Sequence, residues 1–273
     1  MTYLESLGHS VIGCSRKTGC DAGDFERIKS ELARCDLAYH LAADARPAES
    51  LLSPWQTVEV NLRTTTNIGL ACSKAGVPLV YASSCEIYGD SLVPLLEESS
   101  LRPTNPYAAS KLACDRLLFS FQRCYGLDVK IPRLFNPYGP HQQLNKIIPT
   151  LYRQASEGKP LTVYGDGSDT RDYVFIEDIA RGLWEARRLP AGEAVNLATG
   201  IGTTSKQIAD ILILKTLSKS VVRFVPYPEI FGGIRNQVGS YEKAKRLLLW
   251  EPKTNIDVGL DHTIRWLKSL NET

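Results

Sequence analysis

The stretch Tyr107-Ala108-Ala109-Ser110-Lys111 places a phenol and an ammonium four residues apart, directly after a helix start signal. Pro103 and Pro106 interrupt the chain before it, and an apolar stripe at helical spacing follows it. Side chains at i and i+4 share one helix face. A tyrosine that acts as a base near neutrality needs a pKa lowered by roughly 3 units, and the neighbouring cation is the predicted cause. Taken alone, the pair also fits a solvated helix face.

Strands and helices alternate on both sides of this stretch. The predicted strands are residues 11–14, 37–43, 77–84 and 129–134, and the predicted helices are 1–7, 25–33, 54–75 and 107–125. These strands are nearly continuous apolar runs, which is typical of a parallel sheet covered on both faces. The pattern predicts an α/β fold with a doubly wound parallel sheet.

The regular alternation of strands and helices ends at about residue 136, after which the predicted elements are shorter and Gly and Pro are more frequent. Helices are predicted at 149–156, from about 177, at 205–217 and at 257–270, and strands at 161–164, 174–176, 194–197 and 221–224. We expect these elements to form a smaller lobe over one end of the sheet.

Composition limits the possible partners. The 273 residues are 43% hydrophobic, which is enough for a large core. With 32 basic and 30 acidic residues the net charge is +2, so the chain lacks the basic field that nucleic acid or an anionic membrane requires. No apolar run approaches a membrane span, and no signal peptide is recognisable. We expect a cytoplasmic protein with small-molecule partners.

The cysteines do not suggest a metal site. They are seven in number, contain no CxxC pair and have no histidine cluster beside them. We therefore predict buried or free thiols in a reducing compartment and no bound metal.

Three polar stretches are expected to meet at the carboxyl ends of the parallel strands, where such sheets bind ligands. They are Ser83-Ser84, the Tyr107/Lys111 pair, and Phe135-Asn136. A hydroxyl, a phenol and an ammonium around one point suit hydride transfer at an alcohol. Tyr107 would take the hydroxyl proton, Ser84 would hold the same oxygen, and Lys111 would lower the phenol pKa while binding a ribose.

Six blocks in fixed order extend this set over almost the whole chain. They are Leu41-Ala42-Ala43, Asn61, 83–89 (SSCEIYG), 106–111 (PYAASK), 133–140 (RLFNPYGP) and 164–172 (YGDGSDTRD). In this order they resemble the extended short-chain dehydrogenase/reductase family, in its nucleotide-sugar epimerase and dehydratase branch. The resemblance implies a Rossmann-like sheet with tightly held NAD(P), which removes hydride from C4 of a nucleotide sugar and later returns it. The 4-keto intermediate acidifies neighbouring C–H bonds, so epimerisation, dehydration or decarboxylation can follow.

The resemblance also divides the chain. Residues 1–136, with 172–198 returning, would form the NAD(P)-binding domain, and residues 137–273 would mainly form the nucleotide-sugar lobe. A homodimer is expected through a four-helix bundle built from the helices at 54–75 and 107–125, whose alanine- and leucine-rich faces permit it.

Cofactor contacts are implied for several positions. Leu41, Ala42, Ala43 and Asn61 would touch the cofactor, together with Tyr107 and Lys111, and Asp21 would lie near the adenine. The place that usually holds an acid for the ribose hydroxyls falls at Ser15, followed by Arg16. This pair would tolerate a 2′-phosphate, so NADP is possible beside NAD.

Substrate contacts are implied in the second lobe. Asn136 and Arg171 would hold the sugar diphosphate, for which a guanidinium fork is suited. Tyr164 would face the nucleotide base, although simple packing explains it equally well. Arg235 is a weaker diphosphate candidate, because the family's usual Arg-Pro-Gly-Asp segment is replaced by residues 230–233.

The reaction depends on Cys85 and Glu86. Many 4-epimerases of the family carry small residues there, whereas dehydratases and decarboxylases commonly place a glutamate at the second position. A carboxylate near C5 or C6 can move a proton once C4 is a ketone. Cys85 resembles the variant that forms an exo-glycal by dehydration, and its thiol would act as an acid or would be an inert buried residue. The sequence favours dehydration of a UDP- or dTDP-sugar, with 4-epimerisation as the alternative.

The glycine-rich turn that opens the family's first βα unit does not occur in this sequence. Met1 aligns inside the first helix, so roughly 20 residues of the expected unit are missing. Either the start lies upstream, or the chain is a remnant with impaired cofactor binding. We expect weak NAD(P) binding and poor solubility, and the rival functions are a non-catalytic nucleotide sensor and a reductase that consumes NADPH.

Overall fold

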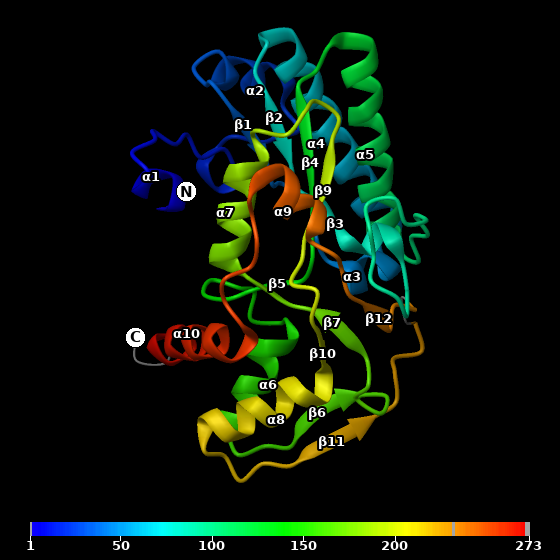
Figure 1. The fold of residues 1–273 in the computed structure, drawn as a ribbon, viewed down its shortest axis with the longest axis vertical. Coiled ribbons are helices and arrows are strands. Elements are labelled where there is room, and N and C mark those ends of the chain that lie inside the picture. The colour runs from blue at the N-terminus through cyan, green and yellow to red at the C-terminus, as the bar shows by residue number, and fades with distance from the viewer. Residues whose placement is uncertain (1, 231–232, 271–273) are drawn as a thin grey trace.

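A parallel sheet forms the centre of the larger lobe in the computed structural model, which describes residues 2–230 and 233–270 (Figure 1). Its strands are β1 (Ala38–His40), β2 (Leu79–Tyr81), β3 (Ser83–Ser84), β4 (Val129–Leu134) and β9 (Ala194–Leu197). β2 and β3 both pair with β4 along the same edge, and every pairing in the sheet is parallel. The predicted α/β fold with a parallel sheet is confirmed.

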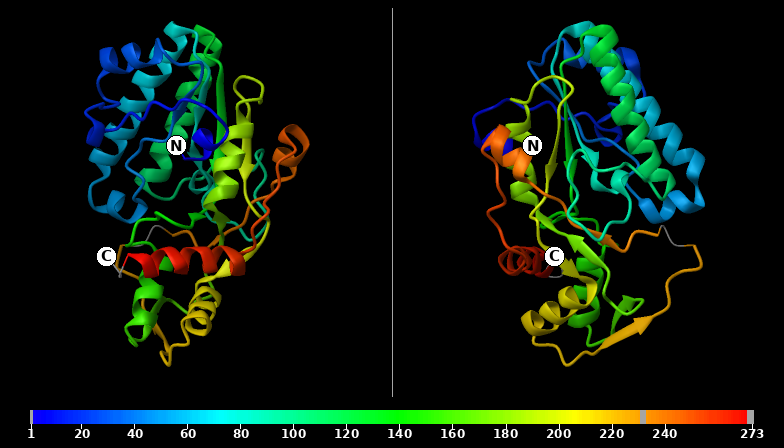
Figure 2. Two further views of the ribbon diagram at one scale, coloured as in Figure 1. Left: turned by 90° about the vertical axis from the view of Figure 1, so that its left-hand side faces the viewer. Right: turned by 45° about the vertical axis from the view of Figure 1, so that its right-hand side comes forward.

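Helices cover both faces of this sheet, as the views in Figure 2 show. Helices α2 (Phe25–Leu32), α4 (Pro54–Ala75) and α5 (Pro106–Tyr125) lie on one face, and α7 (Ile176–Ala186) and α9 (Glu242–Leu248) lie on the other. Strand side chains alternate between the two cores: Leu79 and Tyr81 contact the first, and Val80 contacts the second. Because both faces are apolar, these strands are continuous hydrophobic runs.

Helix α5 begins and ends at clear local signals. The side chain of Asn105 accepts a hydrogen bond from the backbone N of Ala108 at 2.8 Å, and Pro106 occupies the first helical turn. Gly126 ends the helix with a φ of 68°. These signals fix the first turn of the helix, which carries Tyr107, at the carboxyl end of the sheet.

The smaller lobe holds α6 (Ile147–Ser156), α8 (Ser205–Thr216), α10 (Ile256–Ser269) and the parallel pair β6 (Leu161–Tyr164) and β11 (Val222–Val225). A three-stranded sheet joins β10 (Gly202–Thr204), β7 (Thr170–Asp172) and β12 (Asn236–Gln237). β5 (Pro137–Tyr138) pairs with β8 (Val174–Phe175) between the two lobes. Four short elements complete the fold over the described residues: α1 (Thr2–Ser6), α3 (Pro47–Leu52) and the 3-10 turns η1 (Arg16–Thr18) and η2 (Cys85–Tyr88).

The predicted strand at residues 11–14 is wrong, because this segment has no regular structure. A strand needs the N–H and C=O groups of a neighbour, and within the described residues β1 pairs with β2 alone. Instead, the segment leads into η1, where Ser15 caps the turn by accepting from the backbone N of Thr18. Apolar character alone was therefore not sufficient to make a strand.

The prediction of seven unpaired thiols is wrong for two cysteines. Cys14 and Cys20 are joined by a disulfide across η1, because the turn brings their Cα atoms to 5.0 Å. The other five are free, and three of these, Cys72, Cys85 and Cys114, are buried. The cytoplasmic location stays a prediction.

Two predictions fall on residues outside the part of the chain that the structure describes. Met1, at the start of the first predicted helix, lies outside the described residues, as do residues 231–232 of the segment before Arg235. Across the described residues, every helix is too short or too polar to cross a bilayer.

Candidate active site

Ser84, Tyr107 and Lys111 lie together at the carboxyl end of the sheet. Ser84 ends β3, and the other two occupy successive turns of α5. Their exposed fractions are only 8%, 8% and 4%. The Ser84 hydroxyl lies close enough to the Tyr107 phenol to oppose the rise in the phenol pKa that burial causes. The structure thus brings a serine hydroxyl, a phenol and an ammonium into one buried region.

The electrostatics of this trio differ from the expectation. Burial raises the pKa of Tyr107 well above its usual value, and the nearby Glu86 carboxylate raises it further. Burial also lowers the pKa of Lys111 to about 8. Its Nζ donates to the backbone O of Ala82 at 2.6 Å and lies 4.3 Å from the centroid of the Tyr81 ring. Desolvation therefore outweighs any lowering of the phenol pKa by Lys111 in this structure, and the role of Lys111 stays a prediction.

Glu86 connects this trio to a cavity. It belongs to the 3-10 turn η2 (Cys85–Tyr88), which follows β3 directly, and it lines the cavity wall. Asn105 Nδ2 donates to Glu86 Oε2 at 2.8 Å. Burial raises the pKa of Glu86, and the Asn105 hydrogen bond opposes that rise. A carboxyl group in this setting can hold or release a proton at a less acidic pH than a surface glutamate.

Cys85 is buried beside Glu86 and Tyr107. Its Sγ donates a hydrogen bond to Gln237 Oε1 at 3.0 Å. Burial raises the pKa of the Cys85 thiol, and the Glu86 carboxylate adds to the rise. The thiol is therefore neutral near pH 7.

The cavity has a volume of about 480 Å³ and is bounded by both lobes. Its walls come from α3, from Glu86 and Asn105, from the start of α6, from β6 and β7, and from Tyr227, Pro228, Ile230, Ile234 and Gln237. Tyr164 lines it with half of its surface exposed. Asn136 is not among the described residues that line it, and its Nδ2 donates instead to the backbone O of Asp172 at 3.1 Å.

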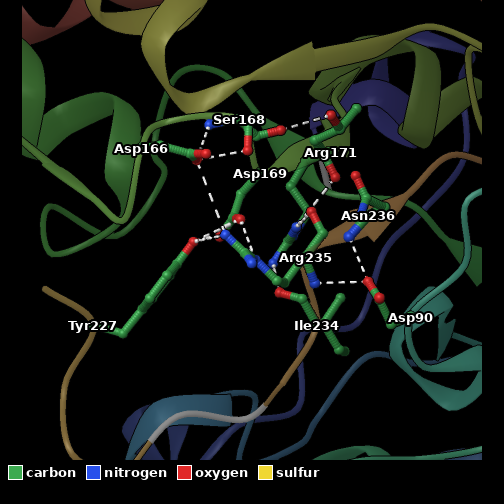
Figure 3. A network of polar contacts seen from close by, with 10 residues as sticks. Asp90, Asp166, Ser168, Asp169, Arg171, Tyr227, Ile234, Arg235 and Asn236 are labelled. Atoms are coloured by element: carbon green, nitrogen blue, oxygen red, sulfur yellow. Dashed lines mark hydrogen bonds and ion pairs between the residues drawn. The ribbon is translucent and has the colours of Figure 1, made fainter. Parts of the chain in front are cut away.

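Two arginines, Arg171 and Arg235, lie in one network of polar contacts beside this cavity (Figure 3). Arg171 lines the wall, and its guanidinium donates to the backbone O of Ile234 at 2.7 Å and of Arg235 at 2.9 Å. Arg235 forms an ion pair with Asp169 at 3.1 Å, and Nη2 of Arg235 donates to Tyr227 Oη at 3.1 Å. The region can attract an anion, but both guanidinium groups already have partners within the protein.

The predicted cofactor residues follow β1 and η1. Leu41 is 58% exposed, and Ala42 is exposed beside it. Asn61 is buried: its Oδ1 accepts from the backbone N of Asp44 at 2.7 Å, and its Nδ2 donates to Ser110 Oγ at 2.9 Å. Asn61 therefore braces the loop after β1 against α5.

The remaining cofactor candidates lie near this loop. Ser15 caps η1. The hydrogen bond from Arg46 lowers the pKa of Asp44, and the charge of Arg16 lowers it slightly further, which places η1 close to the loop after β1. Asp21 is exposed and accepts from the backbone N of Gly23 at 2.8 Å.

The residues present fit the nicotinamide and ribose half of a dinucleotide. An exposed apolar stretch, Leu41-Ala42, follows the strand whose last residue, His40, accepts a hydrogen bond from Ala82 N. The buried ammonium of Lys111 is bound to the O of the same Ala82. An apolar surface beside a cation with three N–H donors suits a flat ring and a ribose diol.

Sequence reasoning missed three residues of the site: Asp44, Asn105 and Gln237. The Asn105-Pro106 pair was a detectable signal, because asparagine before a helix-initiating proline is typical of an N-cap. No local pattern could indicate Gln237, which lies 152 residues from its partner Cys85.

The sheet, with the Ser84–Tyr107–Lys111 trio and the adjoining cavity at its carboxyl end, defines a Rossmann-like α/β protein. A match over residues 1–198 to the model of the NAD dependent epimerase/dehydratase family makes the assignment specific. The chain belongs to this family, and the resemblance to extended short-chain dehydrogenases/reductases is confirmed.

Characterised relatives catalyse several reactions. The chain is 32% identical over 253 residues to the UDP-glucuronate 4-epimerase of Thermodesulfobacterium geofontis, covering 91% of this chain and 78% of that one. It is 29% identical over 277 residues to the dTDP-glucose 4,6-dehydratase of Neisseria meningitidis, with coverages of 90% and 76%.

Two solved structures are similar to this chain over most of its length. The dTDP-glucose 4,6-dehydratase of Streptomyces venezuelae, solved with NAD bound, matches with a TM-score of 0.87 at 31% identity, over 92% of this chain and 79% of that one. The UDP-glucuronic acid 4-epimerase of Bacillus cereus, solved with UDP-glucuronic acid and NAD, matches with a TM-score of 0.85 at 26% identity, over 90% and 80%.

Proposed function

We propose that this chain is an NAD-dependent enzyme that oxidises C4 of a UDP- or dTDP-sugar transiently and then eliminates water across C5 and C6. The main support is the buried Ser84–Tyr107 pair beside Glu86, which lines a cavity with Arg171 on another wall. A cavity lined by a buried acid and a cation, next to a pair of hydroxyl side chains, suits a sugar diphosphate whose ring must lose both a hydride and a proton.

In this proposal the trio acts on the C4 hydroxyl. Ser84 holds the hydroxyl oxygen, Tyr107 takes its proton, and Lys111 binds ribose hydroxyls with Leu41, Ala42 and Ala43 against the neighbouring ring. NAD, when bound, accepts the hydride and brings a positive charge beside the phenol. That charge favours the phenolate, which burial disfavours in the structure described.

Glu86 then acts on C5. A ketone at C4 makes the C5 hydrogen acidic, so the carboxylate of Glu86 can remove it and pass this proton to the departing C6 hydroxyl, which leaves as water. Cys85 supplies a neutral thiol beside the same carbon atoms. At the other end of the substrate, Arg171 holds the diphosphate and Tyr164 faces the base, whereas Asn136 and Arg235, which do not line the cavity, stay predicted diphosphate contacts.

The test is to replace Glu86 by Gln and to follow products by mass after incubation with NAD and UDP- or dTDP-hexoses. The expected result is a product of the wild type that is lighter by one water, and the loss of that product in the variant. Tyr107→Phe should abolish every conversion. A wild type that only epimerises, together with full epimerisation by Glu86→Gln, would refute dehydration.

A 4-epimerase is the second candidate function, because the similarity to the UDP-glucuronate 4-epimerase extends over 91% of the chain. An epimerase would retain the C5 hydrogen and would change only the configuration at C4, so NMR coupling constants of the product would identify it. A wild type with no turnover on any nucleotide sugar would favour a cofactor-impaired remnant or sensor.

We also propose a homodimer built through α4 and α5. These helices lie side by side on one face of the molecule (Figure 2), where Gly69 lets them approach closely. A Cβ atom at Gly69 would lie 2.8 Å from Leu118 Cδ2. Small exposed side chains, Ala109 and Ala113, lie on the outer surface of α5 and would allow a second copy of the helix pair to approach.

A further inference from the structure

Gln237 belongs to the smaller lobe but holds the turn that carries Glu86. Its side chain is completely buried. Oε1 accepts from Cys85 Sγ at 3.0 Å, and Nε2 donates to the backbone O of Cys85 at 2.9 Å and of Gly89 at 3.2 Å. One amide therefore makes three hydrogen bonds to the segment 85–89, at both of its ends.

The two carbonyl partners determine the orientation of this amide. A carbonyl oxygen only accepts, so the NH2 group of Gln237 must face Cys85 O and Gly89 O. The amide oxygen then faces the Cys85 sulfur, and because this oxygen also only accepts, the thiol must donate its proton. A thiolate at Cys85 would face an oxygen lone pair, so this contact exists only for the neutral thiol.

The backbone of Gln237 links this turn to the arginine wall. In the pairing of β12 with β7, Gln237 lies opposite Arg171. Glu86, Arg171 and Gln237 all line the cavity. Gln237 therefore connects the side of the cavity that carries Glu86 with the side that carries Arg171.

We infer that Gln237 is a positioning residue of the active site, whose amide keeps Cys85 a neutral, donating thiol and holds Glu86 toward the cavity. The role of this turn in turnover rests on the proposed function. The state of the thiol does not, so it can be measured separately.

The first experiment compares the full wild-type chain with Gln237→Met, which keeps a similar volume but has no amide. Each is treated with iodoacetamide between pH 7 and pH 10, and alkylation is quantified per cysteine by peptide mass spectrometry. Loss of the acceptor should lower the Cys85 pKa by about one unit and so raise its alkylation rate roughly tenfold. Cys72 and Cys114, which are also buried, should keep their rates. An unchanged rate at Cys85, or a parallel rise at all three thiols, would overturn the inference.

The second experiment uses turnover. Gln237→Met should lower kcat roughly tenfold, because a displaced Glu86 slows the chemical step, and KM for the nucleotide sugar should stay within about twofold. A raised KM with unchanged kcat would mean that Gln237 serves binding alone and would contradict a positioning role. If the wild type converts no nucleotide sugar, the proposed function fails, while the alkylation result still decides the state of Cys85.

Discussion

At the scale of single residues, burial decides the charge states in this site. Lys111 is buried with its ammonium on the O of Ala82, and its pKa falls to about 8. Tyr107, one turn earlier, has a raised pKa for the same reason. Both shifts favour the neutral form, so near pH 8 the described protein holds a phenol beside a partly neutral amine. A charged partner such as the oxidised nicotinamide is needed to shift this balance toward the phenolate.

The Lys111 pKa predicts a pH-dependent stability. Its unfolded value is 10.5 and its folded value is about 8, so between these pH values the unfolded state binds more protons. The free energy of unfolding therefore rises as the pH increases through this window. Relative to Lys111→Met, the free energy of unfolding of the wild type should increase by on the order of 2 kcal/mol between pH 7 and pH 10.

Urea denaturation of both proteins at several pH values measures this difference. Lys206→Met is the matched control, because the Lys206 side chain is half exposed in a surface pair with Asp210. Its difference from wild type should stay constant over the same range. A constant difference for Lys111→Met as well would contradict the buried ammonium.

At the scale of elements, the start of α5 joins stability to chemistry. Asn105 uses both ends of its amide: Oδ1 caps the helix, and Nδ2 binds the Glu86 carboxylate. The helix that carries Tyr107 and the turn that carries Glu86 are therefore fixed to each other by one side chain. This contact aligns the proposed base with the proposed second acid/base group.

Asn105→Ala should lower the free energy of unfolding by about 1 to 3 kcal/mol, because it removes a cap and one partner of a buried carboxyl group. Asn255→Ala is the matched control, since Asn255 caps α10 in the same way by accepting from the backbone N of Val258. It should cost about 1 kcal/mol. Chemical denaturation measures both.

The same two variants give a pH test. The Asn105 hydrogen bond lowers the Glu86 pKa, so its loss should shift the Glu86-dependent limb of the pH–rate profile to higher pH. Asn255→Ala should leave that limb in place. Identical profiles for the two variants would mean that Asn105 does not control Glu86.

At the scale of the whole molecule, two lobes enclose the cavity, and the outer surface of α4 and α5 is the proposed dimer interface. Light scattering should give about twice the 30.3 kDa chain mass for the wild type. Ala113→Glu places an unpaired charge in the proposed interface and should shift the protein to monomer. Leu214→Glu, at an exposed position on α8, should remain dimeric. A monomeric wild type would exclude this assembly.

Much of the fold was predictable because its signals are local. The helices at 54–75 and 107–125 follow from proline and glycine boundaries and apolar periodicity, and the structure places them at Pro54–Ala75 and Pro106–Tyr125. Residues 11–14 have the composition of a strand but no strand beside them, so pattern alone misled. The short elements β7, β10 and β12 exist only through pairing with distant segments, which no local window contains.

The amino-acid sequence by itself determined the alternation of strands and helices, the shared helix face of Tyr107 and Lys111, and the family resemblance, because these depend on spacing along the chain. Only the tertiary structure decided that the side chains of Tyr107 and Lys111 are shielded from solvent. It also decided that Arg171 and Arg235 have partners within the protein, and that Gln237 reaches Cys85. Desolvation and contacts between distant segments arise from packing, and packing sets the pKa of each group and the partner of each donor.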